Sequence, residues 1–123
     1  MEEVLKKPWV RKVEPFGSRV IGCATENSDY DYLVLATHRP STSDLEGTGF
    51  VPDAKDPLYG VDFSSWKRGD VNLVFTDSEQ YFQSTIEACV FCKKYKVYNK
   101  QDRCTLHKVF RDAVKYNTSV FRD

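Results

Sequence analysis

The sequence predicts an α+β fold in which a small mixed β-sheet is flanked by helices. Apolar runs of strand length lie before Asp77, and after it the apolar residues recur about every 3.6 positions, as they do in helices. A chain of 123 residues has room for one hydrophobic core. We therefore expect a single domain over 1–123 with the order strand, short helix, strand, loop, hairpin, helix, helix.

Two strands, a turn and a hairpin are predicted before the helices. Residues 10–16 (VRKVEPF) alternate apolar and polar side chains and lead into the pair 17–18 (GS), and 31–36 (DYLVLA) is an apolar run of strand length. Residues 37–57 are rich in Pro, Gly, Ser and Asp, which predicts a loop excursion. Beyond this loop, YGVDFSSW and DVNLVFT flank the link KRG and predict a β-hairpin.

A pair of helices is predicted over 78–116. Asp77 or Ser78 can cap the first helix, and Asn99 can cap the second. The apolar stripes expected to face the core consist of Phe82, Ile86, Cys89 and Val90 in the first helix and of Leu106, Val109, Phe110, Ala113 and Val114 in the second.

The charges cancel over the whole chain but not along it. The 18 basic and 18 acidic residues give no argument for general affinity to nucleic acid or membranes. Residues 1–92 hold nine basic against fifteen acidic side chains, and 93–123 hold nine against three. This division suits a site with a metal at one wall and phosphates at the other, and it equally suits two solvated faces. The chain has no apolar run of membrane-spanning length and no secretion signal, so we expect a cytoplasmic protein with four reduced cysteines that contacts no membrane.

Asp29 and Asp31 open the second predicted strand. Because they are two residues apart, their side chains point to the same face of that strand. Two carboxylates this close repel each other, and a hard cation such as Mg²⁺ relieves the repulsion while it keeps positions for substrate phosphate. The pattern therefore favours a metal and nucleotide site, although Asp pairs at strand ends are commonly just solvated.

Gly17 and Ser18 strengthen the interpretation of the aspartate pair. A glycine at a strand-to-helix turn lets the main chain approach phosphate oxygens, and the serine hydroxyl adds a donor. The alternative is a tight turn that binds nothing. The turn and the carboxylates occur together on adjoining strands, at a separation that leaves a phosphate room between them.

These stretches resemble a known family. FGSR, a later glycine and SDYDYLVL are similar to the signature of the nucleotidyltransferase superfamily that includes DNA polymerase β, most closely its minimal members. DFSSWKRGDVNLVFTD and the tail ACVFCKKYKVYNKQDRCTLHKVF resemble nucleotidyltransferase-like proteins of tailed bacteriophages. The positions that match the signature are Phe16, Gly17, Ser18, Arg19, Gly22, Ser28, Asp29 and Asp31.

The resemblance implies a third carboxylate on a neighbouring strand, and this chain has Asn72 there. An amide oxygen can still bind a cation, but an amide cannot act as a general base near neutral pH. Two nearby acids could compensate: Asp70, which shares the strand face of Asn72, and Asp62, on the partner strand of the hairpin. Asp77 should face away and cap the next helix. Solvent or the nucleotide could also take the proton.

Two further patterns have competing interpretations. Cys89, Cys92, Cys104 and His107 have the spacing of a zinc site, yet they lie in helical sequence, and we expect no zinc there. His107 is expected on a solvated helix face. The basic cluster between the helices suits either solvated helix ends or contact with triphosphate or RNA. Its members are Lys93, Lys94, Lys96, Lys100 and Arg103.

The function expected from the resemblance is nucleotidyl transfer. Asp29 and Asp31 would hold Mg²⁺ or Mn²⁺, with Asp70 and Asn72 completing the catalytic set, and the nucleoside triphosphate (NTP) would be bound by Gly17, Ser18, Arg19 and Ser28. The acceptor hydroxyl would belong to RNA, a protein or a small molecule, and a phage-encoded enzyme would act in the host cytoplasm. Asn72 favours an alternative, a nucleotide-binding or host-protein-binding relative without catalysis. The sequence gives no oligomeric state.

Overall fold

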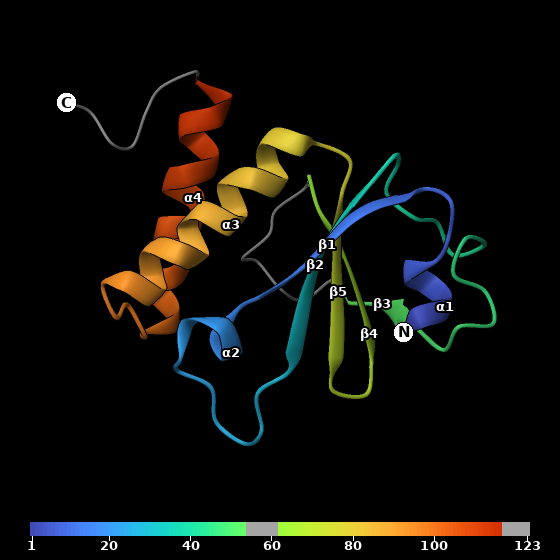
Figure 1. Ribbon diagram of the computed structural model, residues 1–123, viewed down its shortest axis with the longest axis horizontal. Coiled ribbons are helices and arrows are strands. Elements are labelled where there is room, and N and C mark those ends of the chain that lie inside the picture. Colours follow the sequence, from blue (N-terminus) through green and yellow to red (C-terminus); the bar gives the residue numbers. More distant parts are fainter. Residues whose placement is uncertain (54–61, 117–123) are drawn as a thin grey trace.

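Figure 1 shows a sheet with the two long helices on one side and the first helix with the long loop on the other. The computed structural model describes residues 1–53 and 62–116. The elements in chain order are α1 (Glu2–Leu5), β1 (Val10–Phe16), α2 (Ser18–Ile21), β2 (Tyr30–Ala36), β3 (Val51–Pro52), β4 (Ser64–Arg68), β5 (Val71–Thr76), α3 (Glu79–Lys94) and α4 (Lys100–Lys115). None of these helices has the length and apolar character that a membrane span requires in the described part of the chain.

The sheet is mixed, which confirms the predicted fold class. Its strand order is β1-β2-β5-β4-β3, with β2 and β5 parallel and the other neighbours antiparallel. The predicted order of strands and helices is confirmed. The structure adds α1 and the two-residue strand β3, both too short to leave a periodic pattern in the sequence.

The hairpin link was predicted at the wrong residues. Lys67 and Arg68 belong to β4, where they pair with Asn72 and Val71 of β5. The connection is made by Gly69 and Asp70, and Gly69 has a φ of +59°. Tight two-residue hairpin turns require such positive φ values, which glycine adopts without strain, so the glycine sets the turn. Asp62 was predicted to lie on the hairpin strand, but it lies in a turn ahead of β4.

Two apolar clusters cover the two faces of the sheet. One lies under α2, α3 and α4, and the other lies between the sheet, α1 and the loop before β3. The first cluster contains Phe16, Ile21, Leu33, Leu35, Phe63, Val74, Phe82, Cys89 and Cys92. The second contains Val4, Val34, Ala36, Leu45, Phe50, Trp66, Leu73 and Phe75.

The predicted helix stripes and caps need small corrections. Val90 and Val109 are exposed, at 60% and 43%, because the core contacts only a narrow part of each helix. Ser78, and not Asp77, caps α3, since its hydroxyl accepts the N–H of Tyr81. The predicted cap Asn99 is confirmed, and its side-chain oxygen accepts two N–H groups of the first turn of α4.

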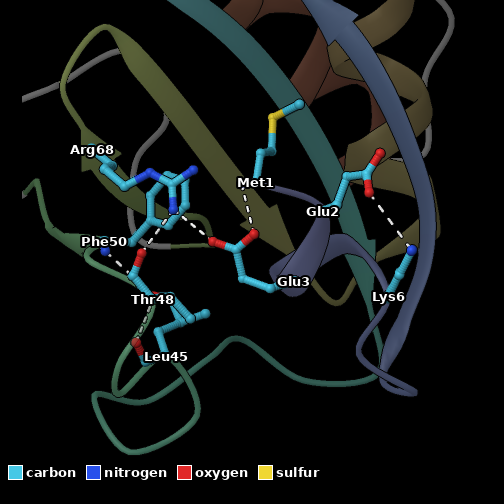
Figure 2. Close-up of polar contacts among 8 residues, drawn as sticks. All are labelled: Met1, Glu2, Glu3, Lys6, Leu45, Thr48, Phe50 and Arg68. Atoms are coloured by element: carbon cyan, nitrogen blue, oxygen red, sulfur yellow. Dashed lines mark hydrogen bonds and ion pairs between the residues drawn. The ribbon is translucent and has the colours of Figure 1, made fainter.

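Arg68 ties the N-terminus and the long loop to β4. Figure 2 shows its guanidinium donating to Glu3 Oε1 at 2.6 Å and to the main-chain oxygen of Thr48 at 2.8 Å, against the Phe50 ring. The N-terminal ammonium and Arg68 lower the pKa of Glu3 to about 2. These contacts hold the outer half of the sheet in place and fix the strand that carries Lys67.

Candidate functional site

A cavity of about 300 Å³ opens at the end of the sheet where β2 and β5 begin and β1 ends. Its lining comes from the sheet, from the turn after β1 and from α4. Asp29 and Asp31 both line this cavity, together with Gly17 and Ser18. The structure thus brings together the two motifs that the sequence singled out.

Three polar side chains form a row across the central strands. Asp31 of β2 pairs with Asn72 of β5, and Asn72 pairs with Lys67 of β4. Directly paired residues point to the same face of a sheet, so the three side chains share the face that carries α3. Asp29 lies two residues before Asp31, just ahead of β2, so it stands next to the row on the same side of the sheet.

Lys67 pairs with one of the acids of the cavity and was missed by sequence reasoning, although it is not itself among the residues that line the cavity. Its ammonium lies 3.2 Å from Asp29 Oδ2, and both side chains are partly exposed. The hydrogen bond and charge of Asp29, with smaller effects of Asp53 and Asp31, raise the pKa of Lys67. The lysine therefore stays protonated and removes part of the repulsion between the carboxylates. The predicted placement of Lys67 in a hairpin link hid this role.

Asn72, at the expected third carboxylate position, is buried and hydrogen-bonded. Only 5% of it is exposed, and its Oδ1 accepts the hydroxyl of Ser65 at 2.8 Å. Asp70, in the exposed β4–β5 turn, and Asp62 are not among the residues that line the cavity. Asp53 does line it, and its N–H donates to the Ser65 carbonyl at 2.8 Å. Asp53 is thus a third acid of the cavity, contributed by the end of the short edge strand β3.

Gly17 brings the main chain directly against Asp31. Its φ is +84°, and a Cβ at this position would collide with Asp31 Oδ2. Any other residue would be strained there and would push the carboxylate away. The Ser18 hydroxyl, next along the chain, has no hydrogen-bond partner among residues 1–53 and 62–116.

Arg19 and Ser28 hold the segment that leads into β2. The guanidinium of Arg19 donates to the Ser28 carbonyl at 2.8 Å and stacks on the Tyr30 ring at 4.0 Å. The Ser28 hydroxyl accepts the N–H of Thr25 at 2.9 Å. Ser28 lines the cavity and Arg19 does not. In this arrangement Arg19 positions the aspartate segment and does not face the cavity.

The wall opposite the sheet is basic and comes from α4. Lys100, Arg103 and His107 lie three and four positions apart, which places them on one face of the helix. His107 is 4% exposed, so the predicted solvated position was wrong. Two members of the predicted basic cluster, Lys100 and Arg103, line the cavity and do not merely cover a solvated helix end. Helical spacing alone cannot show which polar face packs against a neighbour.

Burial makes the stability of the protein depend on the protonation of His107. Burial, with the charges of Arg111 and Arg103, lowers the pKa of His107 from 6.5 to about 4. Between these values the unfolded chain binds a proton that the folded protein does not, so the free energy of unfolding falls as pH falls from 6.5 towards 4. The expected loss is about 2 kcal/mol at pH 5 relative to pH 7.5.

Urea denaturation of the wild type and the His107→Gln variant at the two pH values measures this effect. The carboxylates with lowered pKa, such as Glu3 and Glu79, contribute equally to both proteins. The variant should lose clearly less stability than the wild type between pH 7.5 and pH 5. Equal losses in the two proteins would contradict a buried neutral His107.

The donors present fit a hard cation better than zinc. Asp29 and Asp31 provide carboxylate oxygens at an open cavity, the donors that Mg²⁺ and Mn²⁺ prefer. No group of three or more His, Cys, Asp or Glu that could hold a metal occurs in the described residues. Cys89 and Cys92 are core thiols, and burial raises the pKa of Cys92 to about 11. A neutral buried thiol is a poor zinc ligand.

One of three comparisons with known proteins finds a match. The family model described as "Nucleotidyltransferase domain" matches residues 1–103. Comparisons with curated proteins and with solved structures give no significant match. The matched segment includes the carboxylate pair, the Gly17-Ser18 turn, Lys67 and the first turn of α4.

Proposed function

Because this chain belongs to the nucleotidyltransferase domain family, we propose that it transfers a nucleoside monophosphate from an NTP to an acceptor hydroxyl in a reaction that depends on a divalent cation. The observation that carries the proposal is the cavity in which Asp29 and Asp31 face the Gly17-Ser18 turn. The reaction forms a bond between the acceptor oxygen and the α-phosphorus, and the bond to pyrophosphate breaks.

Asp29 and Asp31 would hold Mg²⁺ or Mn²⁺. Bound there, the cation would neutralise phosphate charge and orient the α-phosphate for in-line attack. Lys67 adjusts the charge of this wall. With its ammonium on Asp29, the wall keeps enough negative charge for a divalent ion but does not repel the polyanionic substrate as strongly as three free acids would.

The Gly17-Ser18 turn would bind phosphate oxygens. The missing side chain at Gly17 lets the Asp31 carboxylate lie against the main chain, and the Ser18 hydroxyl beside it, which has no hydrogen-bond partner among residues 1–53 and 62–116, can donate to a phosphate oxygen. Ser28 lines the same cavity, and Arg19 supports it by holding the Ser28 carbonyl. Positioning and charge neutralisation of this kind account for most of the catalysis in phosphoryl transfer.

The proton of the acceptor hydroxyl needs a destination other than Asn72. The Asn72 amide cannot take it, and its oxygen already accepts the Ser65 hydroxyl. Asp53 lines the cavity and can receive the proton directly or through water, and solvent can receive it otherwise. We assign Asn72 a structural role, in which it keeps the neighbouring side chains of the central strands in position. We assign Asp70 no role in the cavity. Acceptors are RNA, protein or small-molecule hydroxyls, and a phage-encoded enzyme would meet them in the host cytoplasm.

A second candidate function is nucleotide or host-protein binding without catalysis. Asn72 favours it, because the position expected for an acid is filled by a fixed amide. The two functions separate at Asp31→Asn. This substitution should abolish an effect that depends on the metal, and it should leave a pure protein-binding function intact.

Thermal unfolding with each NTP, with and without Mg²⁺ or Mn²⁺, tests the proposed function. We expect a rise in Tm that requires nucleotide and cation together. The corresponding increase in the free energy of unfolding is about 2.7 kcal/mol when the ligand is at 100 times its Kd. A cation alone or a nucleotide alone should give a much smaller shift. No shift with any combination would contradict both the proposed transfer and nucleotide binding without catalysis, and it would leave host-protein binding as the function to test.

A further inference from the structure

The basic wall of the cavity carries two cations whose side chains have no partner in the described part of the chain. The side chains of Lys100 and Arg103 form no hydrogen bond or ion pair with any residue in the ranges 1–53 and 62–116. Arg103 Nε is buried and has no hydrogen-bond partner among these residues. Other cations beside the sheet differ, since Lys67 pairs with Asp29 and Arg68 pairs with Glu3. A buried donor without a partner is costly and indicates a group that satisfies it in the functional state.

The position of the two cations restricts that group to an anion inside the cavity. Lys100 and Arg103 stand on the α4 wall, and Asp29 and Asp31 stand on the sheet wall of the same cavity. Near Arg103 the helix wall holds His107, which is neutral at physiological pH, and the acidic neighbour Asp102 does not line the cavity. One wall therefore suits a cation and the opposite wall suits a polyanion.

We propose that Lys100 and Arg103 form the subsite for the β- and γ-phosphates of the bound nucleotide. This inference rests on the proposed function and assigns the distal phosphates to α4, while Gly17 and Ser18 contact the chain of phosphates near the carboxylates. The role predicted for Arg19 falls to Arg103, because Arg19 does not line the cavity: its guanidinium donates to the Ser28 carbonyl and stacks on Tyr30, although its Nε, like that of Arg103, is buried without a hydrogen-bond partner among the described residues. A guanidinium with free donors can bind phosphate oxygens in a bidentate manner.

The size and charge of the cavity favour a nucleotide polyphosphate over an RNA backbone. A cavity of about 300 Å³ holds a short phosphate chain, whereas an RNA strand needs an extended basic groove. The remaining basic residues of the cluster, Lys93, Lys94 and Lys96, do not line the cavity. The acidic wall would also repel a second polyanion that brought no cation with it.

Isothermal titration calorimetry with three probes tests the subsite. ATP, AMP and inorganic tripolyphosphate, each with Mg²⁺, are titrated into the wild type, the Lys100→Gln/Arg103→Gln variant and a control, Lys93→Gln/Lys108→Gln. The control removes the same charge from exposed positions outside the cavity. We expect the Lys100→Gln/Arg103→Gln variant to bind ATP and tripolyphosphate with a Kd at least about tenfold higher than the wild type, because the substitutions remove charge-assisted hydrogen bonds. Binding of AMP should change less than about twofold, and the control should match the wild type.

The outcomes separate this inference from the proposed function. If the double variant binds ATP as the wild type does, the subsite is wrong and nucleotide binding stands. If the double variant loses as much affinity for AMP as for ATP, the two residues do not contact the distal phosphates. If the wild type binds tripolyphosphate through these residues but does not bind ATP, the subsite stands and the proposed function fails. If it binds neither, both fail. The single Lys100→Gln variant, at an exposed position, keeps the test valid should Arg103→Gln impair folding.

Discussion

The Asp29→Ala/Asp31→Ala variant should lose all metal-dependent binding of nucleotide and yet unfold at a temperature no lower than the wild type. Both carboxylates line the open cavity, and the Asp29 side chain is partly exposed. Their removal ends the repulsion between them and costs the protein a partly exposed ion pair with Lys67, worth little in stability. The stabilisation by NTP and Mn²⁺ should disappear, a loss of about 2.7 kcal/mol at 100 times the wild-type Kd.

Thermal unfolding of the variant and of a matched control measures both parts of this prediction. Glu46→Ala/Glu87→Ala removes two acids from exposed positions outside the cavity and should keep the full ligand effect. If nucleotide and cation still stabilise the aspartate variant, Asp29 and Asp31 do not hold the metal–nucleotide complex. A large fall in its Tm without ligand would show instead that the aspartates are structural.

Gly17→Ala should destabilise the protein strongly, through backbone strain and a steric collision. Gly17 has φ +84° and ψ −161°, a backbone conformation open almost only to glycine, which costs an alanine about 1–3 kcal/mol. The added Cβ also meets Asp31 Oδ2, and it would lie 3.2 Å from Asp31 Cβ and Cγ, which the strand holds in place. Overpacking of this kind costs a further 1–3 kcal/mol, roughly. Because Asp31 must shift, nucleotide affinity should fall as well.

Gly47→Ala is the control for Gly17→Ala. Gly47 also has a positive φ, +80°, but a Cβ there meets no atom within 4 Å. Urea denaturation of both variants separates strain from collision, since Gly47→Ala carries the first alone. Gly17→Ala should be destabilised clearly more, and only Gly17→Ala should bind nucleotide more weakly. Equal losses of stability would mean that the collision is relieved at no cost.

The strands and long helices could be predicted because their patterns are local. Alternation over 10–16, the apolar run over 31–36 and the change of period after Asp77 each extend over enough residues to identify the element. The meeting of the Gly-Ser turn and the aspartate pair could be predicted because each motif adjoins one of two neighbouring strands, and the pairing of these strands brings the motifs together. Capping by Asn99 likewise depends only on neighbours in sequence.

The rest of the cavity depends on contacts between distant segments. Lys67 was missed because the hairpin link was predicted to begin two residues too early, which placed this side chain in the link and not on the strand. Asp53 follows a strand of two residues, which has no pattern of its own. Lys100, Arg103 and His107 have the spacing of a solvated helix face, and only the folded chain, in which α4 packs against α3, shows that they line the cavity.

The most direct test of the central claim is to locate a bound metal–nucleotide complex by NMR. Amide spectra of the ¹⁵N-labelled protein are recorded with ATP and substoichiometric Mn²⁺, with Mg²⁺ as the diamagnetic reference. We expect Mn²⁺ to broaden the amides of Gly17, Asp31 and Arg103 most strongly, only when ATP is present and not in Asp29→Ala/Asp31→Ala. The amides of Val4 and Leu45, which belong to the apolar cluster on the other face of the sheet, should stay sharp. Broadening centred elsewhere, or unchanged in the aspartate variant, would contradict the claim that this cavity binds the metal and the nucleotide.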